Sequence, residues 1–183
     1  CDEVYRILMK MRWQPGLQII PHYESEPLYI KALKNSLEKK ISEINWRPDL
    51  IVASYHGIPK KYFDMGDPYH CYCQKTTRLL TESFKQDIKI KTTFQSRFGP
   101  QEWLQPYTDK TLEKLPNEGK KNVLVICPGF SSDCVETIEE IAMQGKETFL
   151  KNGGKNFDIV PCLNDNNDHI ELLFYLINKY LIR

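Results

Sequence analysis

The sequence has no long hydrophobic run. Its longest apolar stretches, such as Leu50–Ala53 and Val123–Cys127, are only a few residues long, whereas a membrane-spanning helix needs about 20 apolar residues. The first residues, Cys1-Asp2-Glu3, include charges and lack the apolar core of a secretory signal. We therefore expect a cytoplasmic protein without a transmembrane helix.

The sequence also lacks an excess of charge of either sign. Its 25 Lys and Arg residues against 24 Asp and Glu residues give a formal net charge of +1 at pH 7. Proteins that neutralise many phosphates need a wide basic face. We therefore predict no nucleic-acid partner.

Cysteine pairs typical of metal sites and disulfide frameworks are missing too. The six cysteines are dispersed, at Cys1, Cys71, Cys73, Cys127, Cys134 and Cys162. Cys71-Tyr72-Cys73 is not a C-x-x-C pair, and no second pair lies at zinc-finger distance. We expect reduced thiols and no zinc site at these residues.

The sequence does contain enough apolar material for a folded core. Hydrophobic residues make up 41% and charged residues 27% of the 183 residues, a balance typical of a globular protein. At this length one domain is expected, and one domain with part of a neighbour also fits. The first residues of the sequence favour one domain with part of a neighbour. The apolar face of a helix is formed there by Val4, Ile7, Leu8 and Met11, with almost no chain before it.

The hydrophobic pattern predicts alternating strands and helices. Short apolar runs, typical of strands, predict strands at 17–20, 50–53, 89–94, 123–127 and 157–160. The intervening segments predict helices from Pro27 to about Asn45 and at 70–86, 108–115, 133–151 and 168–182. This alternation predicts an α/β fold, with a doubly wound parallel sheet and helices on both faces.

Two strand ends carry residues suited to chemistry. Ligands of open α/β sheets collect beyond the carboxyl ends of the strands. His56 follows the run 50–53, and Asp133 and Glu136 follow the fourth run, 123–127. His56 is either a hydrogen-bonded turn histidine or a group that accepts a proton or binds a metal. We expect both strand ends to face one crevice. The other histidines have no comparable position: His22, His70 and His169.

The acidic residues after the fourth run allow two interpretations. Asp133-x-x-Glu136 before an apolar stripe has the form of a capping box, which satisfies free N–H groups at a helix start. Glu136 and Glu140 lie on one helical face, which fits plain solvent exposure. If that face lines the crevice, the pair becomes a path for protons or a divalent cation, with pKa values raised by mutual repulsion. Spacing leaves both interpretations open.

Four segments in register closely resemble the ferrochelatase family. In chain order they are Ser54–Pro59, Gly66–Tyr69, Phe94–Pro100 with Trp103, Leu104 and Pro106, and Pro128–Asp133 through Glu136; Pro161–Asn164 extends the match. Each segment alone is weak evidence for the family, but the four segments share the order and spacing of the family, which makes the resemblance specific. Ferrochelatases insert ferrous iron into protoporphyrin IX, the last step of haem synthesis, in a cleft between two Rossmann-like domains.

The resemblance covers the carboxyl-terminal part of that family. It implies that residues 24–183 form a Rossmann-like chelatase domain, and that residues 1–23 are the end of a missing amino-terminal domain plus a linker. The last helix, 168–182, would pack back toward that domain. The surface left by the missing domain would be apolar and would favour self-association.

The resemblance also implies catalytic and metal-binding roles. His56 corresponds to the family's histidine on the porphyrin face, which accepts a pyrrole proton or ligates the metal. Glu136 corresponds to its partner carboxylate across the ring. Glu140 would be the second residue, after Glu136, in a row of acidic side chains that leads metal or protons in from the surface. The third position is Gln144, a neutral amide, so the acidic line is interrupted.

Four further residues are expected near the porphyrin: Ser96, Trp103, Phe130 and Asp133. Asp133 would support the network of the histidine and the carboxylate. Cys134 stands where many relatives have histidine, so a second imidazole ligand is not expected.

The resemblance implies substrates rather than cofactors. The partners would be protoporphyrin IX and ferrous iron; hard cations favour oxygen ligands, and pyrrole deprotonation needs a base of near-neutral pKa. Some relatives bind an iron–sulfur cluster through a carboxyl-terminal tail, and because the sequence stops at Arg183 we expect no cluster. Peripheral contact with a membrane, for handing over haem, is left open.

Two other functions stay open. One is a non-catalytic half-domain that folds without enclosing the macrocycle. The other is a cobalt chelatase of tetrapyrrole metabolism, although the Gln95–Pro100 segment favours the iron enzyme.

Overall fold

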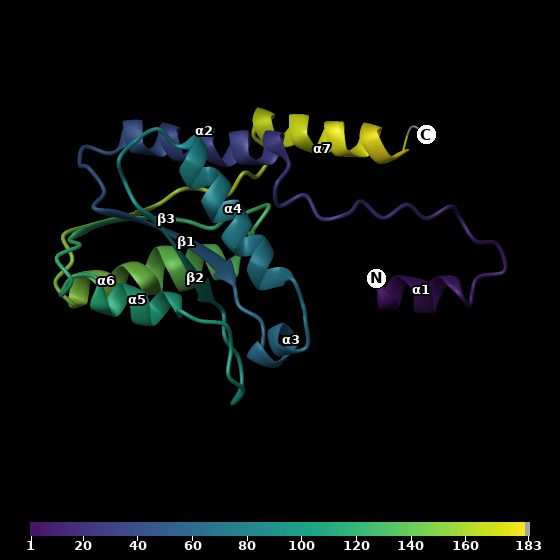
Figure 1. The fold of residues 1–183 in the computed structure, drawn as a ribbon, viewed down its shortest axis with the longest axis horizontal. Helices are drawn as coiled ribbons and strands as arrows, with labels where there is room; N and C mark the ends of the chain where they lie inside the picture. Colours follow the sequence, from purple (N-terminus) through teal and green to yellow (C-terminus); the bar gives the residue numbers. More distant parts are fainter. Residues whose placement is uncertain (182–183) are drawn as a thin grey trace.

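A four-stranded parallel sheet lies between two layers of helices in the computed structural model, which describes residues 1–181 (Figure 1). The strands run in the spatial order β2-β1-β3-β4, and each neighbouring pair is parallel. They are β1 (Leu50–His56), β2 (Ile90–Gln95), β3 (Asn122–Ile126) and β4 (Asn156–Ile159). The predicted α/β fold is confirmed.

Helices cover both faces of this sheet. The helices of the described residues are α1 (Asp2–Leu8), α2 (Pro27–Glu43), α3 (Lys60–Asp64), α4 (Tyr69–Ser83), α5 (Thr108–Lys114), η1 (Glu136–Gly145), α6 (Lys146–Lys151) and α7 (Asn167–Leu181). Helices α2, α4 and α7 lie on one face, and α5, η1 and α6 lie on the other (Figure 1). Such a sheet needs apolar side chains on both faces of its strands.

The core follows the alternation of side chains along β1. Ile51, Ala53 and Tyr55 belong to the core under α2, α4 and α7, whereas Leu50 and Val52 belong to the core over α5, η1 and α6. This two-sided burial explains why the strands appear in the sequence as continuous apolar runs rather than as alternating ones.

Most predicted elements are confirmed with shifted ends, but the strand predicted at 17–20 is wrong. Residues 17–20 form an extended connection and no strand; Leu17 and Ile19 are each 44% exposed, so this run does not pair with the sheet. The predicted helix 133–151 begins only at Glu136, and its first ten residues form η1, a π-helix. The strand at 50–53 continues to His56. Helix α3 was not predicted, and residue 182 of the predicted helix 168–182 lies outside the described residues.

The amino-terminal helix is separate from the sheet. Figure 1 shows α1 at the end of a long connection, away from both helical layers. It has no buried residue, and Val4, Ile7, Met11 and Trp13 are between 43% and 75% exposed. Within residues 1–181, no helix is long and apolar enough to span a bilayer.

Candidate active site

The carboxyl ends of three strands converge where the sequence predicts the site. His56, the last residue of β1, is the register partner of Gln95, the last residue of β2. Cys127 directly follows β3, on the other side of β1, and its thiol lies 3.7 Å from the Gln95 side-chain oxygen. His56 is therefore mounted at the carboxyl end of β1, beside the ends of β2 and β3, and Glu136 begins the helix that follows β3.

The His56 imidazole has a defined orientation. Its Nδ1 lies 2.6 Å from the carbonyl oxygen of Gly57. Because a carbonyl only accepts hydrogen bonds, Nδ1 carries the proton, and Nε2 of the neutral ring holds the free lone pair. The partly buried ring can thus accept a proton or bind a cation through Nε2.

The backbone around His56 is tied to its neighbours. The Tyr69 hydroxyl of α4 donates a hydrogen bond to the His56 carbonyl oxygen at 2.8 Å, and burial raises the pKa of that phenol. The Gly57 N–H donates to the Gln95 carbonyl oxygen, also at 2.8 Å. These contacts fix the end of β1 and therefore the direction of the imidazole.

Two aromatic rings flank the imidazole. The ring centroid of His56 lies 6.4 Å from that of Trp103 and 6.2 Å from that of Phe130. Trp103 can approach because residue 57 is glycine: a Cβ there would lie 3.2 Å from a Trp103 ring carbon and 3.0 Å from the Gln95 carbonyl oxygen. Two residues expected near a porphyrin are thus beside the predicted base.

Glu136 is the first residue of η1 and is only partly exposed. A hydrogen bond from the Cys134 side chain is the main cause that lowers the pKa of Glu136. A backbone hydrogen bond lowers it as well, and the positive charge of a protonated His56 adds a smaller lowering. The raised pKa expected from repulsion between Glu136 and Glu140 is therefore wrong for Glu136. This carboxylate is negatively charged at neutral pH and lies within electrostatic reach of His56.

Glu140 lies one turn further along η1 and is bound to the end of β2. Its carboxylate accepts hydrogen bonds from the Ser96 backbone N–H at 2.7 Å and from the Ser96 hydroxyl at 2.6 Å. Gln144, the neutral third position of the predicted line, is exposed and donates a hydrogen bond to Glu139 at 3.2 Å. The structure thus connects Glu140 to Ser96, a link that spacing did not predict.

The capping-box interpretation of Asp133 and Glu136 is wrong. Helix η1 starts after Val135 without a side-chain cap. The Asp133 carboxylate instead accepts hydrogen bonds from the Thr137 hydroxyl at 3.1 Å and the Asn164 amide at 2.8 Å. Burial raises the pKa of Asp133, but the hydrogen bonds from Asn164, Cys162 and Thr137 outweigh burial and leave it lowered. Asp133 thereby joins the start of η1 to the chain after β4.

The His56, Glu136 and Glu140 side chains do not form a complete metal site. Within residues 1–181, no three His, Cys, Asp or Glu side chains lie close enough together to hold a metal ion. A cation bound by the predicted residues would need further ligands from a substrate or from water.

Gln95 has a structural role that the sequence did not reveal. Its buried side chain accepts a hydrogen bond from the Ser54 hydroxyl at 2.7 Å and donates one to the Glu136 carbonyl oxygen at 2.7 Å. The amide therefore joins β1 and β2 to the start of η1. The signal in the sequence was an amide at the end of an apolar run, but its partners lie about 40 residues away along the chain.

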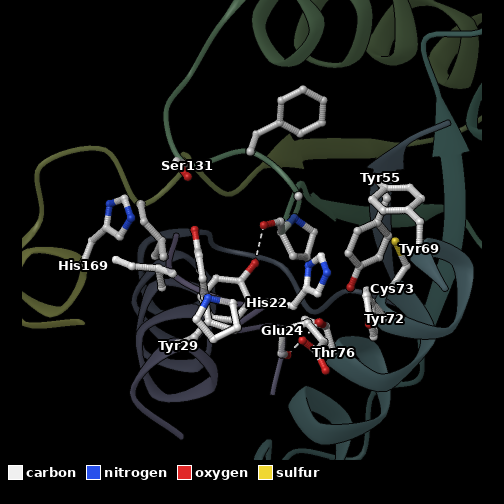
Figure 2. Close-up of a pocket in the computed structure, with 17 residues that line it drawn as sticks. His22, Glu24, Tyr29, Tyr55, Tyr69, Tyr72, Cys73, Thr76, Ser131 and His169 are labelled. Carbon is white, nitrogen blue, oxygen red and sulfur yellow. Dashed lines mark hydrogen bonds between the residues drawn. The ribbon is translucent and has the colours of Figure 1, made fainter. Parts of the chain in front are cut away.

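Residues 128–131, which include Phe130, line one side of a pocket of about 310 Å³. Figure 2 shows side chains that line it, from the connection before α2 (His22), from α2 (Tyr29) and from β1 and α4 (Tyr55, Tyr69). Phe130 is the one predicted site residue among those that line it. A second pocket, of about 330 Å³, lies beside Glu140 and Ser96.

Comparison with known proteins identifies the family. The model of the family described as Ferrochelatase matches residues 1–181. The chain belongs to the ferrochelatase family. It is 52% identical over 182 residues to the ferrochelatase of Rhizobium meliloti (strain 1021), and the match covers 98% of this chain and 53% of that protein.

Other ferrochelatases match over a similar extent. The protein of Allorhizobium ampelinum is 52% identical over 181 residues, covering 98% of this chain and 53% of that protein. The protein of Brucella anthropi is 48% identical over 181 residues, covering 98% of this chain and 52% of that protein. The chain thus spans about half the length of the curated relatives it matches.

Proposed function

We propose that this chain is the carboxyl-terminal part of a ferrochelatase that inserts ferrous iron into protoporphyrin IX to make protohaem. The observation that carries the proposal is the orientation of the His56 imidazole at the end of β1, beside Trp103 and Phe130. The imidazole has a free Nε2 lone pair, a nearby ionised carboxylate with a lowered pKa, and two aromatic neighbours. Family membership connects this arrangement to porphyrin metallation.

The proposed chemistry is a proton-for-metal exchange. Protoporphyrin releases two pyrrole protons as one Fe²⁺ ion enters, and iron stays ferrous, so no electron acceptor or resident cofactor is needed. His56 Nε2 accepts the two pyrrole protons one after the other, and passes each of them on to water. Glu136, held anionic, attracts the incoming cation and replaces part of its hydration shell, because hard cations favour oxygen ligands. The pyrrole nitrogens supply the remaining ligands.

We further propose that the aromatic residues bind the macrocycle. Trp103 and Phe130 flank His56, and flat apolar rings are suitable surfaces for a planar tetrapyrrole. Asp133 acts indirectly, because its hydrogen bonds to Thr137 and Asn164 hold the start of η1. Glu140 would be the next acidic group outward from Glu136.

Both ends of the chain carry exposed apolar residues. We propose that residues 1–23 belong to a preceding domain and its linker, and that residues from 24 onward form the chelatase domain. The exposed apolar residues of α1 support this division. Helix α7 presents a second exposed apolar stripe: Ile170, Leu173, Phe174, Ile177 and Leu181. Both surfaces would be covered by the other domain.

Insertion of zinc or ferrous iron into a soluble porphyrin, followed through the porphyrin absorption bands, tests the proposal. We expect turnover to be lost in His56→Ala and strongly reduced in Glu136→Gln. The variant His22→Ala, which removes an exposed imidazole outside the site, should behave as the wild type. Turnover that survives in His56→Ala would contradict the role of this residue.

A second candidate function is a folded half-domain that binds metal or porphyrin without turnover. The structure favours it because, within residues 1–181, the chain has no group of three His, Cys, Asp or Glu side chains that could hold a metal ion. If the folded chain shows no insertion, calorimetric titration with Zn²⁺ decides the metal role: weaker binding by both Glu136→Gln and His56→Ala supports it. Faster insertion of Co²⁺ than of Fe²⁺ would instead favour a cobalt chelatase.

A further inference from the structure

Ser96 has a backbone conformation that is unusual for its residue type. Its φ is +63°, in the left-handed region that residues other than glycine seldom occupy. Both of its hydrogen-bond donors, the backbone N–H and the hydroxyl, point to the two carboxylate oxygens of Glu140. Hydrogen bonds to an ionised acceptor are among the strong ones, so Glu140 stabilises the unusual conformation.

Ser96 is also the point where the chain leaves the sheet. It directly follows Gln95, the end of β2, and begins the loop 96–103. The exposed part of this loop includes Phe98, which is 85% exposed. The backbone direction at Ser96 therefore determines where the following loop begins.

The far end of the loop is fastened next to His56. The Leu104 N–H donates to the Ile58 carbonyl oxygen at 3.0 Å, and the Lys60 N–H donates to the Glu102 carbonyl oxygen at 2.8 Å. The Trp103 indole N–H donates to the Phe98 carbonyl oxygen at 2.9 Å, within the loop. Loop 96–103 is thus fixed at both ends, by Glu140 at its start and by residues 58–60 at its end.

We propose that Glu140 is a positioning residue for this loop: through Ser96 it holds loop 96–103, and with it Trp103, in place beside His56. The purpose of this contact rests on the proposed function, because a fixed Trp103 matters when a porphyrin lies against it. The contact itself is independent of that function. The role is distinct from carrying metal, because the two carboxylate oxygens are directed at the donors of Ser96.

Substitutions at Glu140 separate the two roles. In Glu140→Gln, the amide oxygen can still accept from the Ser96 N–H and the amide nitrogen can donate to the Ser96 hydroxyl, but the charge that attracts a cation is lost. Glu140→Ala removes both the hydrogen bonds and the charge. Glu139→Ala, an exposed carboxylate on the same helix, is the matched control.

The fluorescence of Trp103 shows directly whether loop 96–103 keeps its position. Its only companions in the sequence are Trp13 and Trp46, so a Trp13→Phe, Trp46→Phe background makes it the sole tryptophan. We expect Glu140→Ala to raise acrylamide quenching of Trp103 and to shift its emission to longer wavelength. Glu140→Gln and Glu139→Ala should keep the values of the background, with circular dichroism verifying the fold of each. Ser96→Ala, which loses one of the two donors, should lie in between.

Two outcomes would overturn the proposal. One is unchanged Trp103 quenching in Glu140→Ala. The other is equal exposure in Glu140→Gln and Glu140→Ala, which would assign the effect to charge alone. These measurements need no turnover, so their failure is distinct from failure of the proposed function. Where turnover is measurable, Glu140→Ala should raise KM for porphyrin, and the control Glu139→Ala should leave that KM unchanged.

Discussion

At the scale of single residues, backbone groups decide what the His56 side chain can do. The Gly57 carbonyl selects the tautomer of the imidazole, and the Tyr69 hydroxyl holds the His56 carbonyl. Neither partner carries out the proposed chemistry, yet both determine where the Nε2 lone pair points. Small changes at such supporting residues should therefore have measurable effects.

Tyr69→Phe tests the support from α4. The variant keeps the ring but removes the hydroxyl that donates to the His56 carbonyl oxygen. We expect the free energy of unfolding in urea to fall by about 0.5–1.5 kcal/mol, the usual net value of one hydrogen bond. Tyr62→Phe, at a residue 45% exposed, is the control and should change stability by less than about 0.5 kcal/mol. Equal stability of the two variants would contradict the supporting role.

Gly57→Ala tests the close approach of Trp103. The new methyl group would lie 3.0 Å from the Gln95 carbonyl oxygen and 3.2 Å from the Trp103 ring, so the loop or the strand end must shift. Overpacking of this kind costs about 1–3 kcal/mol, and we expect a matching loss in urea unfolding with a red shift of Trp103 emission. Gly16→Ala is the matched control, because nothing lies within 4 Å of the added atom. An unshifted emission would show that the site tolerates the methyl group.

At the scale of elements, the start of η1 depends on segments that follow β2 and β4. Gln95 binds the Glu136 carbonyl oxygen, and Asp133 connects Thr137 of η1 to Asn164. π-Helical turns are rare and often occur at functional sites. Here the π-helix begins with the proposed metal-attracting carboxylate, so its supports also place Glu136.

Asp133→Asn tests this support through its pH dependence. The pKa of Asp133 is lower in the folded protein than that of an ordinary aspartate, because hydrogen bonds from Asn164, Cys162 and Thr137 stabilise the ionised form. The stability contributed by the ionised form is therefore complete above the unfolded pKa and is lost as the pH falls through the folded pKa. We expect the stability difference between wild type and Asp133→Asn to shrink as the pH is lowered from 6 to about 3. Urea midpoints across this range measure it, and a constant difference would contradict the expectation.

At the scale of the whole molecule, two apolar surfaces lie outside the core. One is α1 with the connection that follows it, and the other is the outer stripe of α7. The opposite face of α7 packs through Leu172 and Leu176 against the core, so this helix is apolar on two sides. Large exposed apolar surfaces favour association.

The α7 stripe should therefore promote self-association of this chain. Phe174 is 66% exposed, and Phe174→Glu should lower the fraction of oligomer seen in sedimentation velocity at equal concentration. Ser42→Glu adds the same charge at an exposed polar position on α2 and should leave the distribution unchanged. A wild-type chain that is monomeric at all concentrations would contradict the expectation.

The amino-acid sequence was sufficient to predict the α/β class, the approximate positions of the four sheet strands and the position of His56 at the end of a strand. The physical reason is that a strand covered on both faces needs consecutive apolar residues, so β1 and β3 are visible as Leu50–Ala53 and Val123–Cys127. Local apolarity was not sufficient at 17–20, because a strand also needs a partner.

Only the tertiary structure decided which groups hold the site together. The partners of Gln95, Glu140 and Asp133 lie about 30–45 residues away along the chain, and spacing within one segment carries no information about them. Local spacing instead suggested a capping box at Asp133 and repulsion at Glu136. At Asp133, hydrogen bonds from Asn164 and Cys162 outweigh burial, because the folded chain brings these donors to a carboxylate that appears unpaired in the sequence. At Glu136, a hydrogen bond from the side chain of Cys134 lowers the pKa, and the spacing of Glu136 and Glu140 did not indicate it.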